Sequence, residues 1–184
     1  MNFNTGGIPQ YETKFCRFEG DVGLKNGFEI TGYASLFGAK DKGGDMVQKG
    51  AYDASLQRVK KMGSKVKMLW QHNPTQPIGV WDDIREDAKG LYVKGRLLAE
   101  VQAGREALAL LQAGAIDGLS IGYRTVRSEK AQNGGRLLHE IELWEVSLVT
   151  FPMLSEARVQ PSDDEVALAQ NLAETFRQAR DLLA

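Results

Sequence analysis

The chain has 184 residues and 42% of them are hydrophobic, which is enough to form one folded domain around a buried core. Its 23 basic and 24 acidic residues leave a net charge of −1, which argues against a nucleic-acid partner or an anionic membrane. The single cysteine, Cys16, excludes a disulfide framework within one chain, and no apolar run approaches the roughly 18 residues that span a bilayer. The first residues lack the apolar segment of a secretory signal. We therefore expect a soluble, intracellular protein.

The first third of the chain predicts a loose start, two strands and a helix. Residues 1–10 are polar and glycine-rich and are typical of a flexible arm. Alternating apolar residues predict strands over 11–18 and 27–37, the second with a bulge near Gly32. Apolar residues at helical spacing then predict a helix over 51–62.

The middle third predicts three strands and a second helix. The segment 65–72 reads as a strand that ends on a histidine. The segments 78–84 and 90–98 read as two strands joined by a charged turn. A helix is predicted over 100–114, with Leu108 and Leu111 facing inward.

The last third predicts two long strands, 116–129 and 135–151, and a final amphipathic helix over 161–184. The apolar stripe of that helix would pack on the sheet or dock on a partner. Seven strands and three helices without βα alternation predict an α+β fold, in which a small, mainly antiparallel β-barrel is surrounded by the helices. Residues 11–160 are predicted to form this domain.

Ser120 interrupts an apolar strand in the stretch DGLSIGY, with Gly118 and Gly122 two residues away on each side. In a strand these three residues share one face. The missing side chains would leave a trough around the hydroxyl that is wide enough for an extended peptide. The glycines would equally well mark a bulge or a close contact between strands, and the local sequence leaves both interpretations open.

A serine nucleophile needs a base, and the chain has two histidines. His72 lies at the end of a predicted strand, where the chain turns outward at Asn73-Pro74, and functional residues concentrate at such places. His139 lies in the middle of a strand on its apolar face, which favours a packing role.

Glu145 lies in the stretch LWEVSLV, which is apolar on both faces. Burying a carboxylate without a partner is unfavourable, so we expect one. An imidazole N–H and the guanidinium of Arg124 are the two candidates.

The chain offers little for a metal ion or a cofactor. One cysteine and two distant histidines form no spaced ligand cluster. The glycines match no phosphate-binding motif. We therefore predict neither a metal nor a cofactor.

Six blocks, in order and over roughly residues 15–160, resemble the prohead serine proteases of tailed bacteriophages of the HK97 type. The blocks are GYASLFG, GDMVQKGAYDASL, KMLWQHNPTQPIGVW, KGLYVKGRLL, ALALLQAGAIDGLSIGYR and LWEVSLVTFPMLSEARV. The resemblance implies a serine endopeptidase with the fold of the herpesvirus assembly proteases, a small β-barrel ringed by helices.

The resemblance also implies residue roles. Ser120 matches the nucleophile and His72 the base, while Glu145 is our choice for the third member of the triad. Herpesvirus proteases use a second histidine in that role, so His139 is its rival. The loop that follows LWEVSLV places the backbone N–H groups of Met153 and Leu154 as candidate oxyanion donors.

The implied biological role is proteolysis inside the procapsid, in the host cytoplasm. The enzyme would cut the capsid scaffold, or a scaffold-like extension of the major capsid protein, and itself. Its predicted partners are these capsid proteins and, as an open alternative, a second copy of the chain. The competing interpretation is a non-enzymatic scaffold or assembly module on the same fold, or the protease part of a protease–scaffold fusion.

Overall fold

The computed structural model describes residues 12–16, 29–132, 134–152 and 159. The strands in these ranges are β1 (Glu12–Cys16), β2 (Glu29–Leu36), β3 (Met46–Val47), β4 (Lys67–Trp70), β5 (Asn73–Glu86), β6 (Gly90–Leu97), β7 (Gly118–Lys130) and β8 (Arg136–Val149). The helices are α1 (Asp53–Lys61) and α2 (Gln102–Gln112). The predicted arm 1–10 and the predicted helix 161–184 lie outside the described residues, so the division of the chain around 11–160 stays a prediction.

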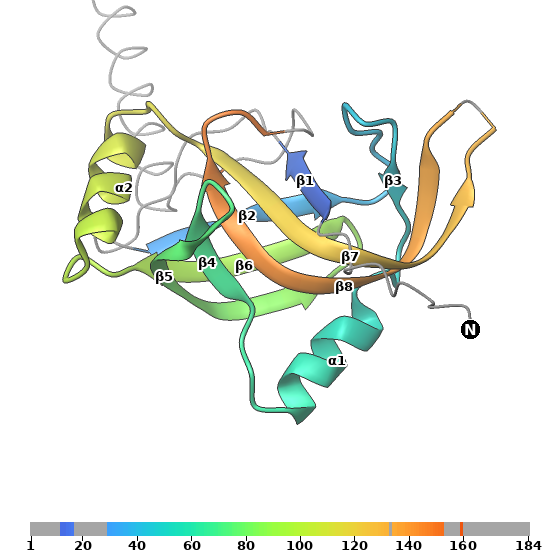
Figure 1. Ribbon diagram of the computed structural model, residues 1–184, viewed down its shortest axis with the longest axis horizontal. Helices are drawn as coiled ribbons and strands as arrows, with labels where there is room; N and C mark the ends of the chain where they lie inside the picture. Colours follow the sequence, from blue (N-terminus) through green and yellow to red (C-terminus); the bar gives the residue numbers. More distant parts are fainter. Residues whose placement is uncertain (1–11, 17–28, 133, 153–158, 160–184) are drawn as a thin grey trace, which may run out of the picture.

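The strands form one curled, mixed sheet in the order β1-β7-β8-β4-β5-β6-β2, with β3 beside β8. Of the seven ladders among the described residues five are antiparallel, and β8 pairs in parallel with β3 and β4. The long β7–β8 ribbon lies over β2 and β6 (Figure 1). Val159 bridges to Gly32 in β2 and donates its N–H to the carbonyl of Asp117, which precedes β7. Of the predicted α+β fold with a small, mainly antiparallel β-barrel, the curled sheet is confirmed, and the described strands form a half-barrel.

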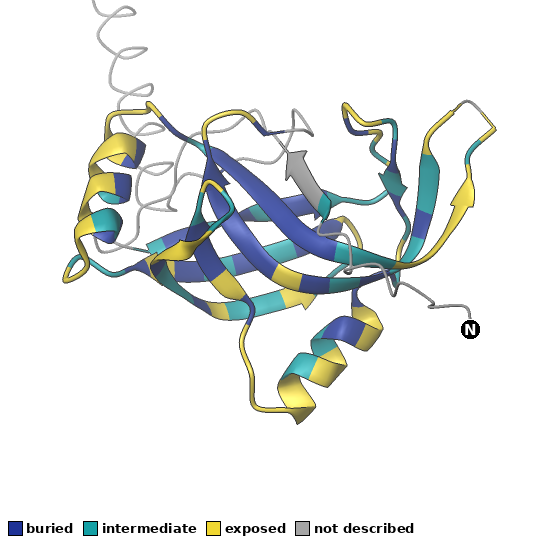
Figure 2. Cartoon of the chain, in the orientation of Figure 1, coloured by how far each residue is buried: buried dark blue, intermediate teal, exposed yellow. Residues whose placement is uncertain are grey.

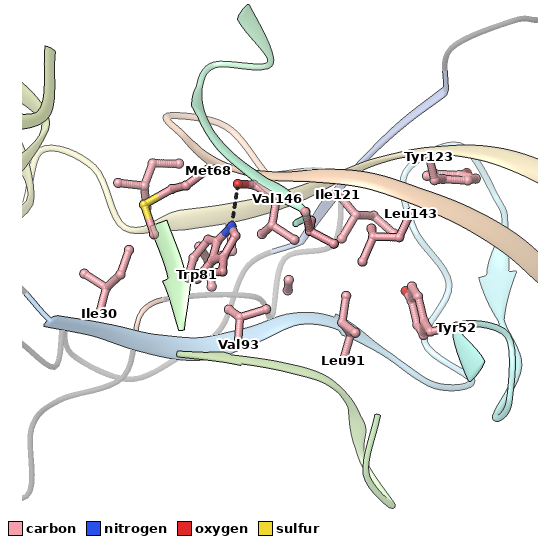
Figure 3. Close-up of a cluster of buried hydrophobic side chains, with 14 of the residues drawn as sticks. Ile30, Tyr52, Met68, Trp81, Leu91, Val93, Ile121, Tyr123, Leu143 and Val146 are labelled. Carbon is pink, nitrogen blue, oxygen red and sulfur yellow. Dashed lines mark hydrogen bonds between the residues drawn. The ribbon is translucent and has the colours of Figure 1, made fainter. Parts of the chain in front are cut away.

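The core fills the space between the β7–β8 ribbon and the strands beneath it (Figure 3). Val146 from the upper layer and Leu91 and Val93 from the lower layer are fully buried there. Trp81 of β5 also lies in the core, and its indole N–H donates to the carbonyls of Lys67 and Val146, at 3.2 Å each. These two bonds link β5 to β4 and β8. Strand β8 carries Glu145, and β4 ends two residues before His72.

Helices α1 and α2 pack against the sheet with one buried and one exposed face each (Figure 2). In α2 the predicted inward side chains are confirmed, since Leu111 is buried and Leu108 packs against the core. The start of α1 is held by Glu86 at the end of β5. Its carboxylate accepts the backbone N–H groups of Gly50 and, at 3.1 Å, Tyr52, which fixes the turn that leads into the helix.

The predicted bulge in β2 is confirmed and lies between Tyr33 and Ser35, just past Gly32. Two other details of the predicted strands are wrong. The predicted strand 65–72 ends at Trp70, so His72 belongs to a turn, and β5 begins directly after that turn. The two-residue strand β3 was missed because it is too short to show an alternating pattern.

Arg136 ties the start of β8 to two other parts of the chain. Its guanidinium lies 2.6 Å from a carboxylate oxygen of Asp45 and 2.5 Å from one of Glu12, and its backbone N–H donates to Asp45. Burial would raise the pKa of Glu12, but hydrogen bonds from Thr125 and Arg136 outweigh it and hold that pKa below its ordinary value.

We expect Arg136→Met to lower the free energy of unfolding by about 2 kcal/mol at neutral pH, because charged hydrogen bonds to Asp45 and Glu12 are lost. Urea denaturation measures the loss. The folded state holds the Glu12 proton less tightly than the unfolded state, so this difference should shrink as pH falls through the lowered pKa. The control is Arg96→Met, which breaks an exposed pair with Asp82 and should cost less than about 0.5 kcal/mol. Equal losses in the two variants would contradict the expectation.

Candidate active site

Three polar side chains that are far apart in the sequence meet at the face of β7 and β8. The Nε2 atom of His72 lies 2.6 Å from the Oγ atom of Ser120. The Nδ1 atom of the same ring lies 2.5 Å from the Oε1 atom of Glu145. The structure therefore brings together the three residues for which the sequence predicted catalytic roles.

The sheet register explains why they meet. Strand β8 lies between β7 and β4, with Ser147 opposite Ser120 on one side and opposite Leu69 on the other. Glu145 is two residues from Ser147 and therefore points to the same face. His72 follows β4 by two residues and lies over this face.

The carboxylate of Glu145 is almost fully buried, with 1% of the residue exposed. One oxygen contacts His72, and the other accepts the hydroxyl of Ser147 at 2.5 Å. Of the two partners left open by the sequence, the imidazole is the one that the structure places beside it. Arg124 instead pairs with Glu142, at 2.7 Å.

The rival histidine lies elsewhere. The Nε2 atom of His139 lies 3.0 Å from a carboxylate oxygen of Glu129, on the stretch of β7 and β8 that leads to their hairpin. This contact is within ion-pair distance but lacks hydrogen-bond geometry. His139 therefore lies apart from the contact between His72 and Glu145.

The turn that carries His72 has an unusual backbone. Trp70 pairs with Asn73, and the two residues between them, Gln71 and His72, have φ angles of 50° and 61°. Both fall in the left-handed region, as in a type I′ hairpin turn, which normally uses asparagine and glycine. For other residues this conformation costs roughly 1–2 kcal/mol each. Such strain concentrates at functional sites, where the surrounding contacts hold it.

Gly118 does not contribute to an open trough beside Ser120. A Cβ atom at this position would lie 2.6 Å from the carbonyl oxygen of Val149 and 2.8 Å from a ring carbon of Pro152. The space is therefore filled by the chain that leaves β8, which matches the alternative interpretation of a close contact between strands.

Two site-related features were missed by the sequence interpretation. Ser147 links Glu145 to the backbone of His72, since its Oγ atom accepts the His72 N–H at 3.2 Å. The side chain of Gln71 pairs with Thr150 just beyond β8. Serine and threonine are too common for either contact to give a local signal. The predicted oxyanion donors, Met153 and Leu154, lie outside the described residues.

Within the described ranges, no group of three or more histidine, cysteine, aspartate or glutamate side chains is placed to hold a metal ion. No helix in the same ranges is long and apolar enough to cross a membrane.

Residues 18–171 match the sequence model of a family described as caudovirus prohead serine protease. The chain belongs to this family. The resemblance inferred from the six sequence blocks is therefore confirmed. A serine protease requires a reactive serine, and the hydroxyl of Ser120 in this chain lies at hydrogen-bond distance from a histidine.

The chain is similar to two curated phage proteins. It is 34% identical to the prohead protease of Enterobacteria phage HK97 over 146 residues, which cover 78% of this chain and 62% of that protein. It is 30% identical to a capsid polyprotein of Pseudomonas phage PAJU2 over 112 residues, which cover 55% of this chain and 17% of that protein. The chain thus spans less than two thirds of the length of either relative.

Two solved structures match parts of the chain. The capsid assembly protease of bacteriophage T4 matches with a TM-score of 0.62 at 17% identity, covering 79% of this chain and 100% of that one. The varicella-zoster virus protease matches with a TM-score of 0.44 at 15% identity, covering 72% of this chain and 62% of that one. The likeness to the T4 protein shows that the fold is shared.

We expect Gly118→Ala to lower the free energy of unfolding by about 1–3 kcal/mol, because the added methyl group overlaps a backbone carbonyl and Pro152. Urea denaturation measures this change. If the variant is as stable as the unaltered protein, the contact between Gly118 and the chain leaving β8 is looser than described.

Proposed function

We propose that this chain is a serine endopeptidase in which Ser120 is the nucleophile, His72 is the general base and Glu145 orients His72. One observation carries the proposal. Both ring nitrogens of His72 are at hydrogen-bond distance from a partner, one from Ser120 and one from Glu145, as in a catalytic triad.

The chemistry follows from this arrangement. His72 Nε2 takes the hydroxyl proton as Ser120 Oγ attacks the peptide carbonyl, and it then gives the proton to the departing amine. An acyl-enzyme ester remains on Ser120. Water hydrolyses the ester by the same route, with His72 again as the base. Glu145 keeps Nδ1 protonated and stabilises the imidazolium form, and its burial strengthens that interaction.

The oxyanion of each tetrahedral intermediate needs fixed N–H donors, each of which is worth about 3–4 kcal/mol in well-studied sites. We assign this role to the backbone N–H groups of Met153 and Leu154. Their position in the chain supports it, since they follow the end of β8 and Pro152, which has no N–H to donate.

The substrates we propose are the capsid scaffold or a scaffold-like extension of the major capsid protein, and the protease itself. Cleavage would take place inside the procapsid, in the host cytoplasm. The family and the names of the HK97 and T4 relatives support this role. The homodimer and a fully closed antiparallel barrel stay predictions.

The match to a capsid polyprotein favours one part of the competing interpretation, a protease segment within a longer capsid protein. The close contacts among Ser120, His72 and Glu145 favour an enzyme over a non-enzymatic assembly module. Labelling with a fluorophosphonate probe distinguishes an enzyme from a non-enzymatic assembly module, because only an activated Ser120 is modified.

We expect Ser120→Ala and His72→Ala each to lower kcat by about 10⁶-fold, and Glu145→Gln by about 10⁴-fold, because the three groups act as a unit. The measurement is cleavage of the scaffold protein of the same phage by the purified variants. Circular dichroism confirms that each variant is folded.

His139→Ala serves as the matched control, since His139 lies apart from the site, and its kcat should stay within about twofold of the unaltered value. Normal scaffold cleavage by Ser120→Ala would show that the proposed function is wrong. A harmless Glu145→Gln combined with a damaging His139→Ala would make His139 the third member.

A further inference from the structure

The position of the His72 ring depends on a turn that its own sequence does not favour. The ring projects from the second of two left-handed residues, and neither is glycine or asparagine. If this turn relaxed, the ring would swing away from Ser120, which is fixed separately in β7. Contacts outside the turn must therefore hold it.

The first such contact comes from Ser147, in the middle of β8. Its Oγ atom accepts the backbone N–H of His72 at 3.2 Å and donates to Glu145 Oε2 at 2.5 Å. Ser147 is fully buried, so water does not compete for either bond. One hydroxyl thus fixes the backbone of the base residue relative to the carboxylate that contacts its ring.

The second contact comes from Thr150, one residue beyond β8. The side-chain amide of Gln71 donates to the Thr150 hydroxyl at 2.7 Å and accepts the Thr150 backbone N–H at 3.3 Å. The backbone N–H of Gln71 also donates to the carbonyl of Leu148, at 2.9 Å. The first residue of the turn is thus bound to the same strand as the second.

We propose that the end of β8 holds the His72 turn at two points, with Ser147 and the Gln71–Thr150 pair acting as positioning residues for His72. This inference rests on the proposed function of His72. Gln71 is the informative member, because a glycine there would suit the left-handed backbone better but could not reach Thr150. The glutamine that is present makes the contact with Thr150, although its backbone does not favour the left-handed conformation.

The test replaces Gln71 by a residue that suits the left-handed backbone but cannot make the side-chain contact with Thr150. We expect Gln71→Gly to keep its melting temperature within about 3 °C of the unaltered protein. Its kcat for scaffold cleavage should fall about 10- to 100-fold with little change in KM, because displacement of a catalytic group by about 1 Å has effects of this size. Unchanged kcat in Gln71→Gly would overturn the inference.

Thr150 offers matched variants. Thr150→Val removes only the hydroxyl that accepts from Gln71 and should lower kcat, whereas Thr150→Ser keeps the hydroxyl and should restore it to within about threefold. Thr75→Val is the control. It removes an exposed hydroxyl in the same hairpin, and this hydroxyl contacts Asn73 instead of Gln71 or His72. Equal losses in Thr150→Val and Thr75→Val would also overturn the inference.

A readout that does not depend on cleavage separates this inference from the proposed function. The low-field proton resonance of the His72 Nδ1–H, held by Glu145, can be followed by NMR in a His139→Gln background that leaves one histidine. Thr150→Val and Ser147→Ala should broaden or remove this signal while the fold is kept. If the unaltered protein shows the signal but neither cleaves scaffold nor reacts with a fluorophosphonate, the proposed function fails. If the unaltered protein cleaves scaffold and reacts with the fluorophosphonate, and the variants keep both the NMR signal and the cleavage rate, the positioning role fails.

Discussion

The site depends on the register of one strand. β8 is antiparallel to β7 and parallel to β4, and the two ladders meet at Ser147, which lies opposite Ser120 on one side. Because side chains alternate, a slip of one residue in either ladder would turn a partner to the other face. What prevents a slip is the apolar face of the same strand, where Val146 and Leu148 are fully buried in the core. Packing on one face therefore fixes the chemistry on the other.

Much of the fold and the site could be predicted from the sequence, because the key residues depart from their surroundings. Ser120 and Glu145 are polar residues in stretches that are otherwise largely apolar, and His72 follows a strand where the chain turns. The long strands and two helices show clear periodicity, and the core positions of α2 follow from it. Such local signals mark the candidates without knowledge of the fold, but the roles of Ser120, His72 and Glu145 followed from the resemblance of the six sequence blocks.

The rest depends on contacts between distant segments. The parallel pairing of β4 with β8, the filling of the space at Gly118 by Pro152, and the links made by Ser147 follow from the sheet and not from any short pattern. The turn at His72 was taken for strand because it lacks the asparagine and glycine that usually mark a two-residue hairpin. Sequence rules for turns fail where tertiary contacts hold an unfavourable backbone.

The order of the strands along the chain has a consequence for synthesis. The strand that carries Glu145 and Ser147 is the last of those described, and it is also the one to which β7 and β4 both pair. A nascent chain that has emerged only as far as β7 holds the serine and the histidine but has no strand on which to align them. The proposed catalytic arrangement thus cannot form until translation has passed β8. For a protein that we propose cuts the capsid proteins made alongside it, reactivity is therefore delayed until this strand has been made.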